Sequence, residues 1–319
     1  MSYEVILGFG LDLIFGDPVK FPHPVKGMGK LINFLEKIVR KTFRNLKIGG
    51  VLLASIVIIS IYVFTFGIIW FSGEINNYLK FILSGVIIWT TLSIRSLHKE
   101  ANSVYQALKI EDINLARIQL SKIVGRDTHN LNKTEISRAT VETVAENTVD
   151  GIISPLFYAF LGGPALSMAF KAVSTLDSML GYKTTIYKEI GCFSARADDV
   201  ANFIPARISA FLIPVASWLC GKNGILSWKT ILRDGHKNPS PNSGIPEAGF
   251  AGALNIQLGG LNYYQGQMSL KPFLGNPNQI IEPEHIRQSI KLMYITSFLM
   301  LIIGVFCILA VNSYKNYFR

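Results

Sequence analysis

The run Gly49–Phe71 carries no charged residue over its whole length, and it constrains the fold more than any other feature of the chain. A helix of about 20 apolar residues spans the roughly 30 Å hydrocarbon core of a bilayer. Leu292–Val311 is equally apolar, and Tyr78–Ile94 is a third such run in which Lys80 is the single charged residue. Of the 319 residues only 16% are charged, against about 25% in soluble domains. The sequence therefore predicts an integral membrane protein.

Three weaker apolar stretches complete the set of candidate membrane segments. Val5–Phe15 is short and contains Asp12, while Ile152–Ala172 and Phe203–Leu219 are interrupted by proline, glycine or arginine. Interrupted helices are tolerated at membrane depth where they line a cavity or are buried in protein. Proline and glycine are also common in ordinary membrane helices, so both interpretations stay open.

The expected fold is all-α: a polytopic integral membrane protein with about 4–6 membrane segments, interrupted helices and a cytoplasmic helical region. We expect residues 1–319 to form a single integral membrane domain, because no Pro/Gly/Ser-rich linker divides the chain. The expected membrane segments are about 49–71, 78–94, 152–172, 203–219 and 292–311. The expected cytoplasmic polar regions are 17–48, 98–151 and 222–290.

Basic residues set the expected orientation. The formal net charge is +10, and the segment 17–48 is rich in lysine and arginine, opposed by Asp17 and Glu36. The positive-inside rule therefore places this segment and 98–151 on the cytoplasmic side. The positive charge also suits an anionic substrate such as a phosphate, and this alternative stays open. Nucleic acid is not expected as a partner, because no basic face interleaved with aromatic residues occurs.

A helix is predicted from about Lys133 to about Val149, preceded by another at about Ser96–Lys109. Asn132 has the right position to cap the N-terminus of the later helix. Glu135, three residues on, is its capping-box partner.

Three carboxylates, Glu142, Glu146 and Asp150, follow one another along this region in steps of four residues. At that spacing they share one helical face and repel each other by a few tenths of a kcal/mol per pair. They would suit Mg²⁺, which takes oxygen ligands and often bridges to substrate phosphates; a solvated acidic stripe is the ordinary alternative. Arg138 lies one step further back. It stays open whether all three carboxylates bind one ion, or whether Arg138 pairs with Glu142.

Further polar motifs flank the interrupted segments. The doublet Asp198–Asp199 lies between arginines, which suits either a metal and a phosphate or a helix N-terminus stabilised by its dipole. A glycine turn at Gly125 is followed by donors that could bind an anion. The stretch 236–260 is expected to be a long polar loop, of a length that usually carries function or is disordered. The residues singled out in these motifs are His23, Arg126, Asp127, Asn147, Asp177, Lys183, Arg196, Asn202, Arg207 and Glu247.

Several common motifs are absent from the sequence. "PVKGMGKL" superficially suggests a P-loop, but that motif needs glycine and Ser/Thr where this chain has Pro24 and Leu31. The cysteines are isolated, so no disulfide framework is expected.

The polar motifs occur in one order: "DPVKFPHPVKGMGKLI", "IVGRDT", "RATVETVAENTVDGIISPLFYAFLGG", "TLDSMLGYK", "SARADDVANFIPAR" and "SPNSGIPEAGFAGALNIQLGG". Together they closely resemble the CbiB/CobD family of cobalamin biosynthesis proteins, the adenosylcobinamide-phosphate synthases. The resemblance covers about Asp12 to Gly260. The other membrane segments share only hydropathy with that family.

The resemblance implies a multi-pass enzyme of the cell membrane, with an active site that faces the cytoplasm. Such an enzyme is an ATP-dependent amide ligase. It joins aminopropanol, or aminopropanol O-phosphate, to the free carboxylate of adenosylcobyric acid and gives adenosylcobinamide or its phosphate. Mg²⁺ and ATP are expected, with the corrinoid as substrate. A homo-oligomer or other proteins of the corrinoid pathway are the expected protein partners.

Amide formation from a carboxylate needs activation, most simply as an acyl phosphate, so cationic clamps and a base are expected. The predicted catalytic residues are Glu146, Asp177 and His23. The predicted substrate- or phosphate-binding residues are Arg126, Asp127, Arg138, Asn147, Lys183, Arg196, Asn202, Arg207 and Glu247. The predicted metal ligands are Glu142, Glu146, Asp150, Asp198 and Asp199. For all of them to face one side of the membrane, Thr175–Val200 must fold back, at least in part, into a cytoplasm-facing cavity.

Two other functions stay open at the level of sequence. An intramembrane Mg²⁺-dependent prenyl or phosphoalcohol transferase also places Asp-rich motifs at the membrane surface, but the second such motif here is only a doublet. A non-enzymatic membrane sensor or accessory protein would not need so many ionisable groups. These groups favour the amide ligase.

Overall fold

The computed structural model describes residues 2–17, 23–182 and 185–317, with side chains up to residue 314. The described chain is helical apart from one two-stranded antiparallel hairpin. The elements are, in chain order, α1 (Ser2–Phe15), α2 (Pro24–Thr42), α3 (Leu46–Ile75), α4 (Asn77–Trp89), α5 (Ile94–Lys109), α6 (Ile113–Ser121), α7 (Lys133–Thr148), a π-helix (Val149–Ile153), α8 (Ser154–Leu180), α9 (Cys192–Leu219), α10 (Gly224–Asp234), α11 (Gly244–Leu254), β1 (Leu258–Tyr264), β2 (Gln267–Leu274) and α12 (Pro283–Tyr317).

The chain divides into two compact units. Unit 1 comprises Met1–Ser93, Ser154–Asn202 and Leu301–Arg319, and unit 2 comprises Ile94–Ile153 and Phe203–Met300. Each unit is therefore built from segments that are distant in the sequence.

Five helical stretches of the described chain are long and apolar enough to cross a membrane. They are Leu46–Ile75, Asn77–Lys109, Lys133–Leu180, Cys192–Leu219 and Pro283–Tyr314. Each contains one of the segments expected from the sequence, and the first and last have the highest mean hydropathy, 2.6. The chain is an all-α polytopic membrane protein, as expected.

The core of unit 1 lies between α2, α3 and α8. Met28, Ile32 and Val39 lie on one face of α2 and pack against Leu53 and neighbouring residues of α3 and α8. The lysines of α2 at positions 26, 30, 37 and 41 are exposed. The segment 17–48, expected as a polar region, thus contains an amphipathic helix, because its apolar residues recur at helical spacing.

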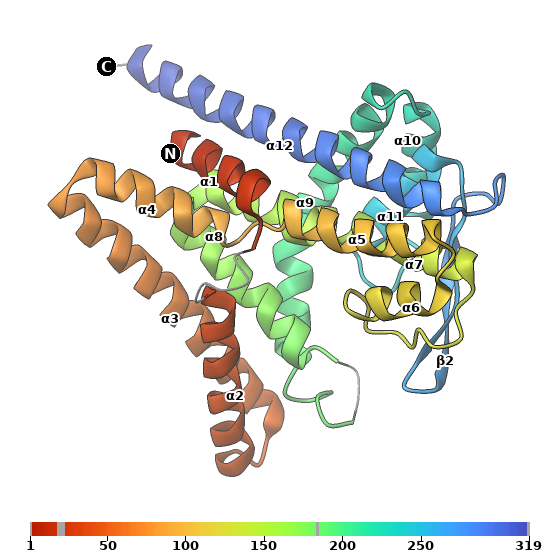
Figure 1. Cartoon of the computed structure of the whole chain (residues 1–319). Helices are drawn as coiled ribbons and strands as arrows, with labels where there is room; N and C mark the ends of the chain where they lie inside the picture. Colours follow the sequence, from red (N-terminus) through yellow and green to blue (C-terminus); the bar gives the residue numbers. More distant parts are fainter. Residues whose placement is uncertain (1, 18–22, 183–184, 318–319) are drawn as a thin grey trace. The chain divides into compact units, whose positions relative to one another are not determined.

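Helices α3 and α4 form a hairpin in unit 1 (Figure 1). Asn76 ends α3 and caps α4, and its side-chain oxygen accepts a hydrogen bond from the Tyr78 N–H at 2.7 Å. Helix α1 packs on α4 where glycine faces glycine: a Cβ on Gly8 would lie 2.8 Å from the carbonyl oxygen of Gly85. Small residues of this kind allow membrane helices to approach closely.

Helix α8 is interrupted, as its glycines and prolines indicated. Gly162 and Gly163 have non-helical backbone angles, and Gly163 has a φ of +70°, which favours glycine. Pro164 then begins the second half. Ser167 donates a hydrogen bond to the carbonyl oxygen of Pro155 at 3.1 Å. This hydrogen bond links the two halves of α8 across the interruption.

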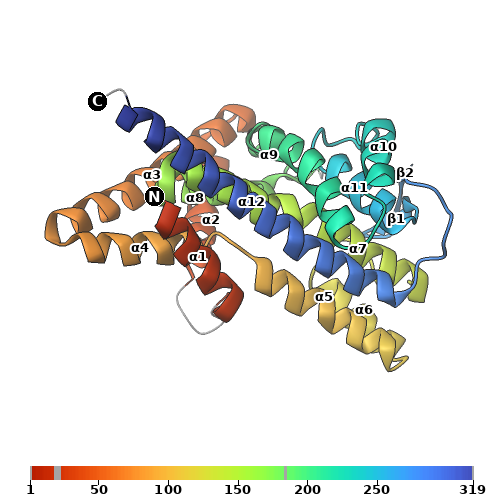
Figure 2. The same ribbon diagram turned by 90° about the horizontal axis from the view of Figure 1, so that it is seen from above.

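In unit 2, helix α7 packs against α5, α6, α11 and β1. Figure 2 shows α5 and α6 side by side, and α10 packs extensively on α11. The capping box predicted for α7 is present, with Asn132 and Glu135 each accepting from the other's backbone N–H at 3.0 and 2.8 Å. The predicted helix bounds are also confirmed to within one residue.

The expectation of one long loop over 236–260 was wrong. This stretch contains the buried helix α11 and the start of β1. Each glycine lowers helix propensity by about 1 kcal/mol relative to alanine. The glycines of α11 therefore do not indicate a helix in the sequence. Close packing compensates, because a Cβ on Gly252 would lie 2.6 Å from the Thr230 hydroxyl and one on Gly249 would lie 2.9 Å from Ile213.

Two glycines of α3 provide a matched test of this packing. A Cβ on Gly50 would lie 2.1 Å from the carbonyl oxygen of Ile190, whereas one on Gly67 would meet nothing within 4 Å. We expect Gly50→Ala to lower the unfolding free energy by about 1–3 kcal/mol, because the two backbones must separate. Gly67→Ala should be neutral or slightly stabilising. Thermal unfolding in detergent measures both, and equal effects would contradict the packing described.

Candidate functional site

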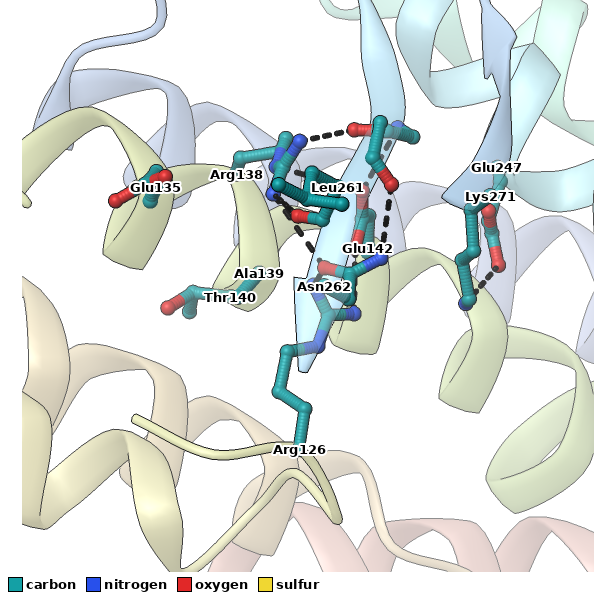
Figure 3. A network of polar contacts seen from close by, with 12 residues as sticks. Arg126, Glu135, Arg138, Ala139, Thr140, Glu142, Glu247, Leu261, Asn262 and Lys271 are labelled. Atoms are coloured by element: carbon teal, nitrogen blue, oxygen red, sulfur yellow. Dashed lines mark hydrogen bonds and ion pairs between the residues drawn. The ribbon is translucent and has the colours of Figure 1, made fainter. Parts of the chain in front are cut away.

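A buried ion pair lies at the centre of unit 2. The Arg126 guanidinium donates through Nη2 to Glu142 Oε2 at 2.6 Å and through Nη1 to Asn262 Oδ1 at 2.6 Å (Figure 3). The two charged side chains are 6% and 1% exposed. Burial alone would lower the pKa of Arg126, but the Glu142 carboxylate outweighs it and raises that pKa. Arg126 therefore stays charged, and the contact joins the segment before α7, α7 itself and β1.

Glu142 and Arg138 also hold the start of the hairpin. Glu142 Oε1 accepts a hydrogen bond from the Gly259 N–H at 2.8 Å. Arg138 donates to the carbonyl oxygens of Gly259 and Leu261, while its Nε lies 3.9 Å from Glu142. Arg126 is thus the closer partner of Glu142, and Arg138 chiefly serves the backbone of β1.

The glycine pair of "QLGG" is required by this arrangement. Gly259 and Gly260 have φ of +86° and +93°, in the region that favours glycine. A Cβ on Gly260 would lie 2.7 Å from Arg138 Nη1. The irregular strand register at this point lets the backbone approach the arginine.

Asp127 fixes the other end of the hairpin. Its carboxylate accepts hydrogen bonds from the N–H groups of Gln265 and Gly266, at 3.2 and 2.7 Å, and its own N–H donates to the Tyr263 carbonyl at 2.8 Å. Asp127 therefore holds the turn, and the predicted phosphate-binding role stays untested.

A cavity of about 200 Å³ opens beside the ion pair. It is lined by Ile123, Val124, Gly125, Arg126, Thr143, Glu146, Asn147, Tyr264 and Lys271. Glu146 makes no hydrogen bond or ion pair with any side chain of the described chain. The Asn147 amide donates to the Thr143 carbonyl at 2.9 Å, which leaves its oxygen available. Two cations and one carboxylate thus meet in a small polar space.

Lys271 lines the cavity and also lies beside a second buried carboxyl group, that of Glu247. Its Nζ lies 3.8 Å from Glu247 Oε1 (Figure 3), and Glu247 Oε2 is buried without a hydrogen-bond partner. Burial raises the pKa of Glu247 to about 8, against the attraction of Lys271. Burial alone would lower the pKa of Lys271, but the charges of Glu247 and Glu146 raise it. Lys271 therefore stays an ammonium, and the buried Glu247 carboxyl holds its proton more tightly than an exposed one would.

The predicted site residues fall in both units. Unit 2 contains Arg126, Asp127, Arg138, Glu142, Glu146, Asn147, Asp150, Arg207 and Glu247. Unit 1 contains His23, Asp177, Arg196, Asp198, Asp199 and Asn202. Lys183 lies outside the described residues. The structure brings Arg126, Glu146 and Asn147 together in the lining of one cavity. Glu247 lies next to Lys271, which lines the same cavity.

The four-residue stripe does not continue to Asp150. Helix α7 ends at Thr148, and Asp150 lies in the π-helix Val149–Ile153. A π-turn holds more residues than an α-turn, so the register that aligns Glu142 with Glu146 is lost. The three carboxylates thus occupy different surroundings.

Two predicted catalytic residues of unit 1 have local structural contacts. His23 caps α2, with Nδ1 accepting from the Val25 N–H at 3.3 Å and Nε2 lying 3.3 Å from Asp17 Oδ1. Asp177 folds over Gly181, where a Cβ would lie 1.9 Å from its Oδ1. Their catalytic roles stay predictions.

The remaining polar residues also connect segments. Asn202 donates to Asp198 at 2.9 Å and accepts from Ser154 at 2.6 Å. Arg207 stacks over the Phe203 ring at 3.6 Å and donates to Asn242 at 2.7 Å. Contacts within the protein thus account for these polar side chains beside apolar segments, and no ligand is needed to explain them.

No group of three or more His, Cys, Asp or Glu side chains in the described chain could hold a metal by itself. Mg²⁺ does not need such a group, because it binds through one or two carboxylates together with substrate phosphates and water. Glu146, which has no side-chain partner, fits that requirement, and Arg126 and Lys271 fit the phosphate. Glu142 does not fit the requirement for a metal ligand, because both its carboxylate oxygens already accept hydrogen bonds.

Sequence reasoning missed Lys271, Asn262 and Tyr264. All three lie on the hairpin, inside a region taken as a polar segment between helices. The available signal was the turn "YQGQ" between two runs rich in aromatic and apolar residues, which is typical of a hairpin.

The chain is similar to known proteins over nearly all of its length. The family profile described as CobD/Cbib protein matches residues 5–293. A "Cobalamin biosynthesis protein CobD" of Leptospira interrogans is 44% identical, over 95% of this chain and 96% of the relative. Proteins of the same name from Clostridium tetani and Geobacter metallireducens are 45% and 46% identical, over 98% and 89% of each chain. No solved structure matches.

The raised pKa of Glu247 predicts a pH dependence of stability. Because the folded pKa is raised, the folded state holds this proton more tightly than the unfolded state. Its contribution to stability is complete below the unfolded value of 4.5 and is lost as the pH rises through about 8. The thermal midpoint in detergent should therefore fall between about pH 5 and pH 9, and Glu247→Gln should flatten that fall by roughly 3 °C or more. Equal slopes for the two proteins would show that Glu247 ionises normally.

Proposed function

The chain belongs to the CobD/Cbib family of cobalamin biosynthesis proteins, and we propose that it is the enzyme that joins an aminoalcohol to a corrinoid by ATP-dependent amide formation. The corrinoid is adenosylcobyric acid, and the aminoalcohol is aminopropanol or its O-phosphate. The observation that carries the proposal is the near full-length similarity to relatives named for cobalamin biosynthesis. We further propose that the enzyme lies in the cell membrane with this site facing the cytoplasm, since basic segments flank its membrane helices.

The reaction needs two steps to balance. In the first, a carboxylate oxygen of the corrinoid attacks the terminal phosphorus of ATP, which gives an acyl phosphate and ADP. In the second, the amine nitrogen attacks the acyl carbon, the amide bond forms and phosphate leaves. One proton must leave the ammonium before that attack.

The cavity beside α7 suits the second step. Arg126 and Lys271 supply positive charge for the phosphate of an aminoalcohol phosphate, and charged donors make the stronger hydrogen bonds to phosphate. A space of about 200 Å³ fits a small phosphorylated amine better than a nucleotide, since sites for drug-sized ligands measure about 300–1,000 Å³.

Glu146 is the residue that we propose to bind the amine and to act as its general base. Its carboxylate attracts the ammonium, orients it and accepts its proton. Mg²⁺, which Glu146 would hold together with phosphate oxygens, would neutralise phosphate charge.

The direct test uses the purified chain in detergent with adenosylcobyric acid, aminopropanol phosphate, ATP and Mg²⁺. We expect the amide product by mass spectrometry, and loss of product in Glu146→Gln with an unchanged thermal midpoint. Turnover of a lipid diphosphate without amide would instead favour a prenyl or phosphoalcohol transferase.

A matched pair of lysines tests the phosphate site within the same assay. Lys271→Gln should raise KM for aminopropanol phosphate about tenfold or more, the equivalent of about 1.4 kcal/mol, and change KM for aminopropanol less. Lys133→Gln is the control, because Lys133 is exposed on α7 away from the cavity. Equal effects of the two substitutions would remove Lys271 from phosphate binding.

A further inference from the structure

A larger cavity lies in unit 1, and two of the predicted site residues, Arg196 and Asp199, are part of its lining. It measures about 590 Å³ and is bounded by the first turn of α3, the chain just after α8, the segment 187–191 and the first two turns of α9. This volume lies within the range of about 300–1,000 Å³ typical of ligand sites.

Three cations line this cavity: Lys47, Lys188 and Arg196. None of them has a side-chain hydrogen bond or ion pair with another residue of the described chain. The nearby Arg40 differs, because it donates to Glu36 at 2.7 Å and to the Ile186 carbonyl at 3.1 Å. The three cations have no such partners, so their charge is available to a ligand.

Two carboxylates, Glu189 and Asp199, also line the cavity, and Asp199 has contacts of its own. The lining side chains remain net positive. Helix α9, which is 28 residues long, begins at Cys192 in the cavity wall. The N-terminus of a helix carries positive charge, which adds to the attraction for an anion.

One part of the wall is held by close backbone packing. A Cβ on Gly191 would lie 1.8 Å from the Leu180 carbonyl oxygen, so the chain before α9 packs directly on the end of α8. Tyr182 and Tyr187 line the same space, with ring centroids 6.3 Å apart, and the Arg40 guanidinium lies over the Tyr187 ring at 5.3 Å. The cavity thus offers aromatic surface beside its cations.

We propose that this cavity is a binding site for a phosphate-bearing ligand, whose phosphate lies among Lys47, Lys188 and Arg196. Such a ligand has two sources. A free ligand such as a nucleoside triphosphate would place its planar part against the tyrosines. An anionic lipid would enter from the bilayer, because Lys47 lies in the first turn of the membrane helix Leu46–Ile75. Its lining residues all belong to unit 1 and differ from those of the cavity in unit 2. The proposal concerns binding and does not depend on amide formation.

The test is a binding measurement on the full chain without turnover. Calorimetry in detergent measures the affinity of the chain for ATP and for pyrophosphate. Comparison of the chain in nanodiscs of phosphatidylglycerol and of phosphatidylcholine measures binding of the anionic lipid. We expect Lys188→Gln and Arg196→Gln each to weaken binding about tenfold, as for loss of one charge-assisted contact. Lys41→Gln is the control, because Lys41 is exposed on the basic helix α2 but does not line the cavity.

The outcomes separate the sources. Binding of ATP or pyrophosphate that weakens in the two variants and not in the control identifies a free phosphate ligand. Selective binding of phosphatidylglycerol with the same pattern identifies a lipid. Absence of binding to every probe, or binding that the cavity variants and the control change equally, would overturn the proposal. Because the readout is affinity, it stays informative if the enzyme assay shows no amide product.

Discussion

The buried contact between Arg126 and Glu142 holds the polar part of unit 2 together. Moving two charges out of water costs several kcal/mol per ion, and mutual attraction offsets this only when other hydrogen bonds complete the geometry. Here they do, because Asn262 accepts from the arginine and the Gly259 N–H donates to the carboxylate. Three segments distant in the sequence are thereby fixed to one another, and the hairpin is fixed against α7.

The small cavity follows from that arrangement. The hairpin carries Lys271 and Tyr264 to the face of α7 that presents Glu146, one turn beyond Glu142. Glu142 is engaged in the ion pair with Arg126. Glu146 therefore remains a carboxylate with no side-chain partner beside two cations. Neighbouring carboxylates on one helix thus have different tasks: one holds the fold and the other is available to a ligand.

Hydropathy and helix-end chemistry were readable from the sequence. The long apolar helices, the interruption at Gly162–Gly163 and the Asn132 capping box depend on residues close together in the chain, and all are present in the structure. The partner of Glu142 was not readable, because helical spacing pointed to Arg138 while the closer arginine comes from the preceding turn segment. Lys271 was missed for the same reason, since it lies on a hairpin far along the chain from α7 and reaches the cavity only through tertiary contacts.

Glycine was the other source of error. In α11 and in "QLGG" it indicated a loop, but in the structure it allows close packing of α11 and a positive φ beside Arg138. Local propensity favours loops at such positions, and tertiary contacts override it. The cavity of unit 1 shows a similar limit: its cations come from three separate segments, and no single motif contains them.

A double-mutant cycle on Arg126→Met and Glu142→Leu tests the central contact most directly. Each single substitution leaves the other charge buried and should cost about 3–5 kcal/mol of unfolding free energy. The double variant leaves no uncompensated charge, so its loss should be smaller than the sum by more than about 2 kcal/mol. Unfolding in mixed micelles measures all four proteins. Losses that add to within about 0.5 kcal/mol would contradict a direct, buried Arg126–Glu142 interaction.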